Sequence, residues 1–167
     1  KYNAGASELV RRNRIQFGTG SPKNIRTNVP VPSIPVGKQR LYFLPDKLLI
    51  VENKDAGAVS YATLDVSVAS TKFIETEGVP GDAQIVDHTW KYVNKRGGPD
   101  KRFKDNVQLP IALYAQVDFA SSTGLRERLN VSNVANAEHF GEAIRKLAVY
   151  YRDIEGIKWA GTICKQL

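Results

Sequence analysis

Sulfur and histidine are scarce in this sequence. Its 167 residues include one cysteine, Cys164, two histidines and no methionine. A lone thiol cannot form an internal disulfide, which favours a reducing compartment, and we expect the cytoplasm. A zinc site needs three or four ligands. Glu138, His139 and Glu142 come nearest to such a set, and we interpret them as a solvated helix face. We expect neither a metal nor a cofactor.

The sequence also lacks a long apolar run. No stretch approaches the roughly 20 apolar residues that a membrane-spanning helix needs. The opening "KYNAGASELVRRNR" has no apolar segment of the length found in signal peptides. Because the chain begins with Lys1 and contains no methionine, we expect a fragment of a longer protein. The hydrophobic content of 42% suits one folded domain with a core.

Acidic residues are almost absent from residues 1–40, which contain eight cations and only Glu8. This segment accounts for the whole net charge of +7, since the rest of the chain contains equal numbers of cations and acids. A basic arm is typical of contact with nucleic acid or an anionic membrane. A soluble, poorly ordered leader has the same composition, so both interpretations stay open. The candidate binding residues of the arm are Arg11, Arg12 and Arg14.

Proline and glycine are concentrated in residues 18–37, "GTGSPKNIRTNVPVPSIPVG". Proline at this density blocks helices and limits strands to sheet edges. We therefore predict an extended connector whose Val29, Val31 and Ile34 pack on the body of the domain.

Between Gly37 and Val131 the apolar residues follow a period of two, which is typical of β-strands. The predicted strand segments are "RLYFL" (40–44), "KLLIVE" (47–52), "AVSYATLDVSV" (58–68), "TKFIE" (71–75), "QIVDHTWKYV" (84–93), "LPIALYAQVDF" (109–119) and "LRERLNV" (125–131). In the last three segments, the residues predicted to share a face are Val86, His88, Trp90 and Tyr92; Ile111, Leu113, Ala115, Val117 and Phe119; and Leu125, Glu127, Leu129 and Val131.

The period changes after Val131. Apolar residues now stand four, three and four positions apart, at Phe140, Ile144, Leu147 and Tyr151. This spacing predicts an amphipathic helix whose apolar stripe lies on the sheet. Asn136 is expected to cap its start, and residues 153–167 are expected to continue as broken helix.

Seven strands with short connections are expected to pair antiparallel in chain order. Such strands cannot leave both faces in water, so we predict that they bend into a barrel or sandwich. The C-terminal helix closes an open end. The predicted fold class is mainly β with a C-terminal α-helix.

Three segments carry a family resemblance. "GKQRLYFLPDKLLIV" (37–51), "AVSYATLDVSV" (58–68) and "AEHFGEAIRKL" (137–147) resemble the opening hairpin, third strand and closing helix of bacterial pleckstrin-homology-like and GRAM-like domains. The resemblance covers residues 37 to about 151 and implies a seven-stranded, partly open barrel capped by one helix. It also implies a binding or scaffolding role.

The resemblance sets the expected domain organisation. Residues 1–36 form the basic arm or connector, residues 37–152 the barrel, and residues 153–167 an extension. The sequence departs from the family pattern at residues 71–108, which form a longer stretch than such domains need.

Catalytic patterns are weak. Pro45-Asp46 and Glu52-x-Lys54 match in part a nuclease signature that needs two carboxylates on one metal. We expect these acids at opposite ends of one strand, roughly 20 Å apart at about 3.3 Å per residue, which excludes a shared metal. Cys164 has no histidine near it in sequence, and no serine lies in a Gly-x-Ser-x-Gly context. We expect a protein without catalytic residues.

The strongest local signal is "HTWKYVNKRGGPDKRFKDN", residues 88–106. Residues 91–105 contain six cations and two acids inside a body that is neutral overall. Exposed backbone N–H groups in a Gly-Gly-Pro turn can hold a phosphate, and cations beside aromatic rings are typical of single-stranded nucleic-acid sites. Solvated hairpin tips have a similar composition. The candidate binding residues here are Trp90, Lys91, Tyr92, Lys95, Arg96, Lys101, Arg102 and Lys104.

These observations favour a non-enzymatic adaptor or scaffold domain that docks a protein partner through the basic hairpin and the arm. Two alternatives stay open. One is a nucleic-acid-binding module that uses the same two regions, and the other is a domain that binds anionic lipid.

Overall fold

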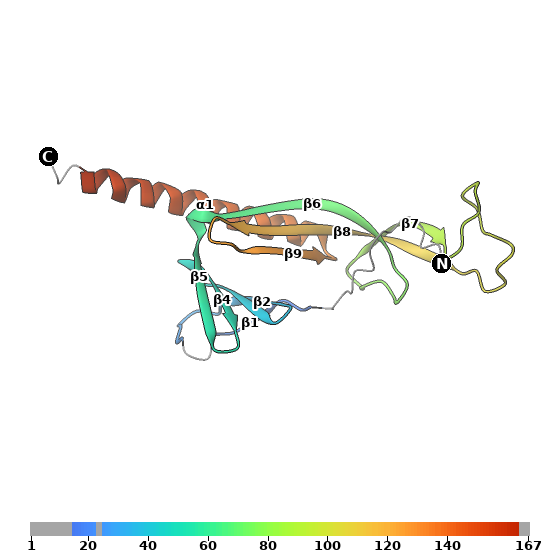
Figure 1. Cartoon of the computed structure of the whole chain (residues 1–167), viewed down its shortest axis with the longest axis horizontal. Coiled ribbons are helices and arrows are strands. Elements are labelled where there is room, and N and C mark those ends of the chain that lie inside the picture. The colour runs from blue at the N-terminus through green and yellow to red at the C-terminus, as the bar shows by residue number, and fades with distance from the viewer. Residues whose placement is uncertain (1–14, 23–24, 164–167) are drawn as a thin grey trace. The chain divides into compact units, whose positions relative to one another are not determined.

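The computed structural model describes residues 15–22 and 25–163, with side chains described up to residue 156 (Figure 1). The described residues fall into two compact units. One unit contains residues 68–117 and 129–139. The other contains residues 15–22, 25–67, 118–128 and 140–163.

The first sheet has five antiparallel strands that pair in chain order. Its strands are β1 (Gly18–Thr19), β2 (Pro32–Val36), β3 (Gln39–Phe43), β4 (Lys47–Glu52) and β5 (Asp55–Ser60). Two-residue turns join β2 to β3 and β4 to β5, as the pairs Val36↔Gln39 and Glu52↔Asp55 show. Gly37 and Asn53 take the positive φ angles, 58° and 54°, that such tight hairpin turns require.

The second sheet does not follow chain order. After the 3-10 helix η1 (Tyr61–Thr63), its strands are β6 (Leu64–Ile74), β7 (Gln84–Trp90), β8 (Gln108–Ser121) and β9 (Arg126–Val131). The order is β6-β8-β7, and β9 also pairs with β8. The expectation that neighbouring strands in sequence pair was therefore wrong for β6 and β7. The nine-residue connection 75–83 is long enough to let β8 pair between them.

The expected fold class, mainly β with one C-terminal helix, is confirmed. The number of strands differs, since the described residues form nine strands in place of seven. Hydrogen bonding joins these strands into two separate sheets and does not close them into a barrel. Segments 58–68 and 71–75 were predicted as two strands. They instead contain the end of β5, the turn η1 and the continuous strand β6.

The helix α1 (Val134–Ile163) begins and ends differently from the prediction. The cap is Asn133, whose side chain accepts a hydrogen bond of 3.0 Å from the backbone N–H of Asn136. Asn136 itself lies within the helix, so its predicted capping role was wrong. The helix continues unbroken through the predicted extension as far as Ile163.

The predicted apolar stripe of α1 is confirmed. Ile144 is buried, and Phe140, Leu147 and Tyr151 are half-buried. The Phe140 ring contacts Phe43 at 5.2 Å and Phe119 at 6.2 Å between centroids. The helix is therefore packed against β3 and β8 within its unit, as an amphipathic stripe requires.

The connector at 18–37 is more ordered than expected. It contains β1 and β2, and Val31 and Ile34 are fully buried as predicted. Val29 remains 43% exposed, so its predicted packing was wrong. β2 accommodates its two prolines because it pairs along its length only with β3, while β1 covers two residues on the other side.

The alternation predicted for 109–119 is confirmed in its second half only. Ala115, Val117 and Phe119 are buried. In the first half the buried residues are Ala112 and Tyr114, in place of the predicted Ile111 and Leu113. Tyr114 is held inward because its hydroxyl donates to the Glu75 carboxylate at 2.8 Å and its ring contacts Phe73 at 5.5 Å.

The predicted face of β7 was also wrong. Val86 and His88 are exposed, and Trp90 and Tyr92 are half-buried. A register shift between Ile85 and Asp87 interrupts the pairing of β7 with β8. Such a bulge breaks the period of two on which the prediction depended. In the segment 125–131 the predicted face is confirmed at Leu125, directly before β9, and at Leu129 within β9, which are both buried.

No helix among the described residues is long and apolar enough to cross a membrane.

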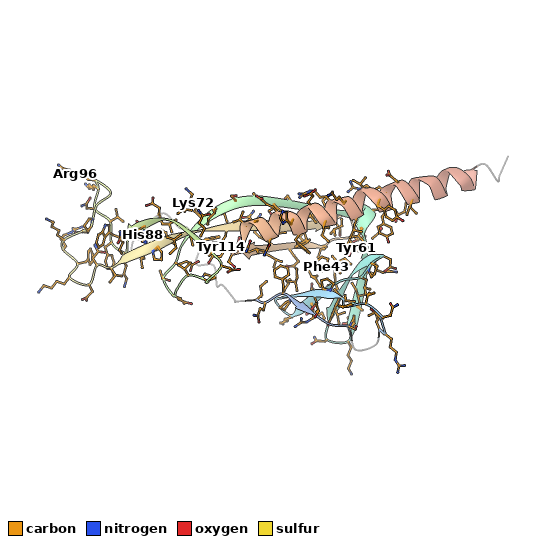
Figure 2. All side chains as sticks on the ribbon, turned by 180° about the vertical axis from the view of Figure 1, so that it is seen from behind. Phe43, Tyr61, Lys72, His88, Arg96 and Tyr114 are labelled. Atoms are coloured by element: carbon orange, nitrogen blue, oxygen red, sulfur yellow. The ribbon has the colours of Figure 1, made fainter. Side chains whose placement is uncertain are left out.

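The Tyr61 hydroxyl is the clearest polar contact of the core. Tyr61 is fully buried, and its hydroxyl donates to the Leu44 carbonyl at 2.8 Å (Figure 2). We predict that Tyr61→Phe lowers the free energy of unfolding by about 1–2 kcal/mol, because it leaves that carbonyl without its donor. Urea unfolding measures the change. Tyr42→Phe is the control, since the half-buried Tyr42 hydroxyl has no hydrogen bond to a described residue. Equal losses in the two variants would contradict this role.

Candidate partner-binding hairpin

The chain between β7 and β8 is held at its base by one asparagine. The Asn106 side chain accepts a hydrogen bond from the Tyr92 backbone N–H at 2.9 Å and donates to the Tyr92 carbonyl at 2.8 Å. The Lys91 N–H donates to the Val107 carbonyl at 2.9 Å just beyond β7. The Asn106 side chain thus makes the two hydrogen bonds to Tyr92 that a paired strand would otherwise make. These bonds hold the two arms of the hairpin together.

A second asparagine organises the tip. The Asn94 side-chain oxygen accepts hydrogen bonds from the backbone N–H groups of Arg96 at 2.8 Å and Gly98 at 3.2 Å. The Gly97 N–H donates to the Asn94 carbonyl at 3.0 Å. Gly97 has a φ of 83°, which a residue with a side chain rarely adopts. The sequence predicted free N–H groups in this turn. The N–H groups of Arg96, Gly97 and Gly98 are already used by Asn94, so these three donors do not form a backbone cradle for a phosphate.

An ion pair stabilises the segment of the hairpin that follows the tip. The Arg102 guanidinium donates to both carboxylate oxygens of Asp100, with the closest atoms 2.6 Å apart. The Arg102 backbone N–H adds a bond of 3.1 Å. These side-chain and backbone hydrogen bonds hold the pKa of Asp100 below its ordinary value. Arg102 was predicted to contact a partner, but much of its bonding capacity is used within the loop.

The remaining cations of the hairpin face solvent. No acidic side chain among the described residues forms an ion pair with them, and Asp105 is the one exposed acid in the same stretch. The Asp100–Arg102 pair is neutral as a unit, so the local excess of positive charge predicted from the sequence persists. Figure 2 places Arg96 in the loop beyond β7. The exposed cations are Lys91, Lys95, Arg96, Lys101 and Lys104.

The aromatic residues of the hairpin pack on each other. The Tyr92 and Phe103 rings are stacked, with centroids 4.0 Å apart and planes at 16°. The Lys91 ammonium lies 5.5 Å from the Tyr92 ring centroid. Phe103 remains 43% exposed, whereas Trp90 is half-buried at the end of β7. The stack leaves one face of Phe103 available to a ligand. Because the two rings are in contact, a nucleic-acid base cannot insert between them.

Sequence reasoning found the cations of this site but missed the residues that shape it. Asn94 and Asn106 were not among the predicted site residues. Asparagine on either side of a Gly-Gly-Pro turn is the available signal, because its side chain commonly bonds to nearby backbone.

The other predicted sites gain no support. Arg11, Arg12, Arg14 and Cys164 lie outside the described residues. Asp46 and Glu52 flank and end β4 as expected, and they are therefore separated by its length. Within the described part of the chain, no three His, Cys, Asp or Glu side chains gather in a group that could hold a metal.

The effect of Arg102 on Asp100 is measurable. Because the pKa of Asp100 is depressed in the folded chain, its stabilising contribution is present above the ordinary carboxyl pKa and is lost as pH falls through the depressed value. We predict that Arg102→Gln raises the pKa of Asp100 toward its ordinary value, so that the stabilising contribution is smaller and its loss is complete at higher pH. NMR titration of the carboxyl carbons over roughly pH 2–6 measures the shift. Lys101→Gln should leave the Asp100 pKa in place, and an unchanged pKa in Arg102→Gln would contradict the assignment.

Comparison of the chain with protein-family models, with curated proteins and with solved structures finds no match. A function must therefore be inferred from the geometry and charge of the described residues.

Proposed function

We propose that this chain is a non-catalytic binding module of a larger cytoplasmic protein, and that it docks an acidic surface of a protein partner through the hairpin 88–106. One observation carries the proposal. Five exposed cations that form no ion pair with a described acid lie on a loop whose backbone is fixed by Asn94, Asn106 and Asp100.

These hydrogen bonds matter because a loop of fixed conformation loses little conformational entropy on binding. Exposed lysine and arginine side chains at the rim of an interface mainly steer association and select a partner of opposite charge. Phe103 and Val93 of the hairpin and Val107 directly after it add exposed apolar surface, with 43%, 40% and 53% of each residue accessible. A charged rim beside aromatic and aliphatic side chains is the usual composition of a protein–protein interface.

A likeness to pleckstrin-homology-like domains, without a closed barrel, remains part of this proposal. Its support is the antiparallel strand series β3–β4–β5 within residues 37–60, and a closing helix that begins at Val134. The pairing of the strands into two sheets supports the likeness only at this coarse level. Because such a fold hosts lipid, peptide and protein ligands alike, the choice of partner depends on the hairpin itself.

Nucleic acid is the second candidate, and the exposed face of Phe103 beside cations is the observation that favours it. The Asn94 bonds weigh against it, because they remove the backbone donors that commonly hold phosphates. Anionic lipid is the third candidate and would use the same cations together with the basic arm.

We predict that Lys95→Glu combined with Arg96→Glu weakens binding of labelled poly-glutamate, an acidic polypeptide probe, by about tenfold or more, because it reverses two exposed charges at the tip. The melting temperature should change by less than about 2 °C, since neither side chain is paired. Fluorescence anisotropy and thermal unfolding measure the two effects. The control is Lys38→Glu with Lys54→Glu, which makes the same charge change on the first sheet.

Parallel titrations separate the alternatives. Tighter binding of a single-stranded oligonucleotide, with an affinity that falls steeply and log-linearly with salt, would favour nucleic acid. Co-sedimentation with phosphoinositide vesicles and not with neutral vesicles would favour lipid. Equal poly-glutamate affinity in the hairpin variant and the wild type would remove the hairpin from consideration.

A further inference from the structure

The outer face of α1 exposes two large apolar side chains side by side. Val149 is 56% exposed and Tyr150 is 58% exposed, the highest values among the large hydrophobic residues that the structure describes. Both lie on the side of the helix that faces away from Ile144 and Ala148, which are buried. More than half of the surface of each residue is therefore accessible to a partner.

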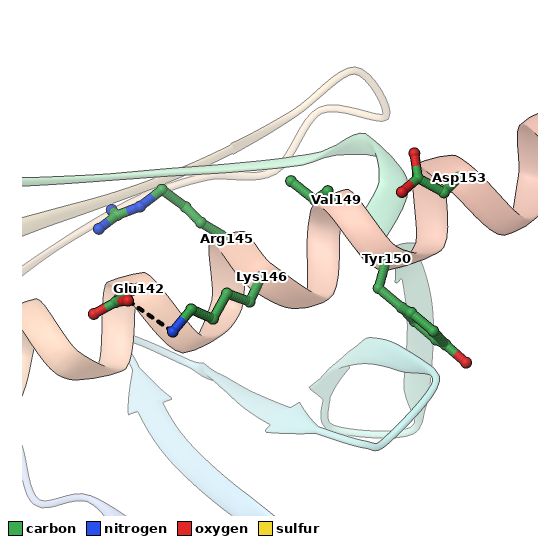
Figure 3. A pocket seen from close by; sticks show the side chains of 6 residues that line it. All are labelled: Glu142, Arg145, Lys146, Val149, Tyr150 and Asp153. Atoms are coloured by element: carbon green, nitrogen blue, oxygen red, sulfur yellow. Dashed lines mark ion pairs between the residues drawn. The ribbon is translucent and has the colours of Figure 1, made fainter.

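The surroundings of these two residues have the geometry of a helix-packing site. A shallow depression of about 450 Å³ is lined by Glu142, Arg145, Lys146, Val149, Tyr150 and Asp153 (Figure 3). These positions form two overlapping sets with the spacing i, i+3, i+4 and i+7. Four residues at this spacing form the hole that receives one side chain of a facing helix in coiled-coil packing. The face therefore offers two consecutive holes to a second helix.

The charges on this face are ordered along the helix. Lys146 pairs with Glu142 at 2.7 Å, and both side chains remain more than half exposed. Asp153, two turns beyond Lys146, is exposed and forms no ion pair with a described residue. Arg145 is turned aside, since its guanidinium donates to the Val66 carbonyl at 3.3 Å. The apolar pair thus lies between a lysine on one side and an aspartate on the other.

We propose that this face pairs with the same face of a second copy of the chain, with the two helices antiparallel and the two-fold axis between Val149 and Tyr150. In this arrangement each Val149 packs against Tyr150 of the second copy, and each Lys146 lies beside Asp153 of the second copy. A parallel pair would instead place like charges together at both positions, which is unfavourable. The charge order therefore selects a second copy in the antiparallel direction.

The helix pairing is independent of the function proposed for the hairpin, since it uses no hairpin residue. The described contact is small, so we expect a weak dimer in rapid exchange. The contact between Lys146 and Asp153 is made twice by symmetry. A single reversal therefore affects both ends of the interface at once.

Sedimentation equilibrium up to about 0.5 mM protein tests the pairing, because small interfaces need high concentration. The wild type is expected to show a concentration-dependent shift from the monomer to the dimer mass. Lys146→Asp alone and Asp153→Lys alone should each weaken the dimer by about tenfold, since each places like charges together. The double variant Lys146→Asp with Asp153→Lys should restore dimerisation to within a few-fold of the wild type.

Lys54→Asp is the control, because it reverses one exposed charge in the turn between β4 and β5. It should dimerise like the wild type. Circular dichroism of each variant confirms that the helix is intact. A wild type that stays monomeric over the whole range would overturn the proposal. So would a dimer that ignores both single reversals, or a double variant that is no stronger than the singles.

Discussion

The packing of α1 depends on the Phe140 ring. It contacts Phe43 of β3 and Phe119 of β8, and Phe43 and Phe119 contact each other at 6.0 Å. Aromatic rings bury a large area per residue, so this trio joins three distant segments into one core. It also fixes the rotation of the helix. Val149 follows Phe140 by nine positions, which is half a turn around the axis, and therefore points outward.

The hairpin is ordered by a different principle. It has little apolar interior, and polar side chains take the place of strand pairing. Asn94, Asp100 and Asn106 each bond to backbone groups of the loop. These short-range bonds let the loop keep a defined shape although most of its residues are exposed. For function, this means that the exposed cations are held on a backbone of defined shape. The polar hydrogen bonds of the loop, and not a hydrophobic core, oppose the repulsion between these cations.

Local patterns predicted the elements better than their pairing. The run at 47–52 and the stripe from Phe140 to Tyr151 appeared where the period indicated, because burial on one face imposes that period. The pairing of β8 between β6 and β7 could not be predicted, since a nine-residue connection permits more than one neighbour. The faces near Val86 and Tyr114 were misread because a bulge and a buried Tyr–Glu bond break the alternation.

In the candidate site, too, some features could be predicted from the sequence and others could not. Charge is a property of composition, so the cations at 91–104 were identified directly from the sequence. The use of the Gly-Gly-Pro amides by Asn94 depends on three-dimensional closure of the turn, and neither Asn94 nor Gly97 signals it alone. Arg102 looked like one more free cation, because its pairing with Asp100 depends on side-chain direction.

The bulge in β7 has a consequence for the behaviour of the protein at high concentration. β7 is the last strand in its order, so one edge has no strand beside it among the described residues. At the bulge the Asp87 carboxylate accepts the His88 amide at 2.7 Å. A kinked edge with a carboxylate over its amide is a poor template for a foreign strand. This corner of the sheet therefore resists the chain-to-chain stacking through which exposed β-structure aggregates.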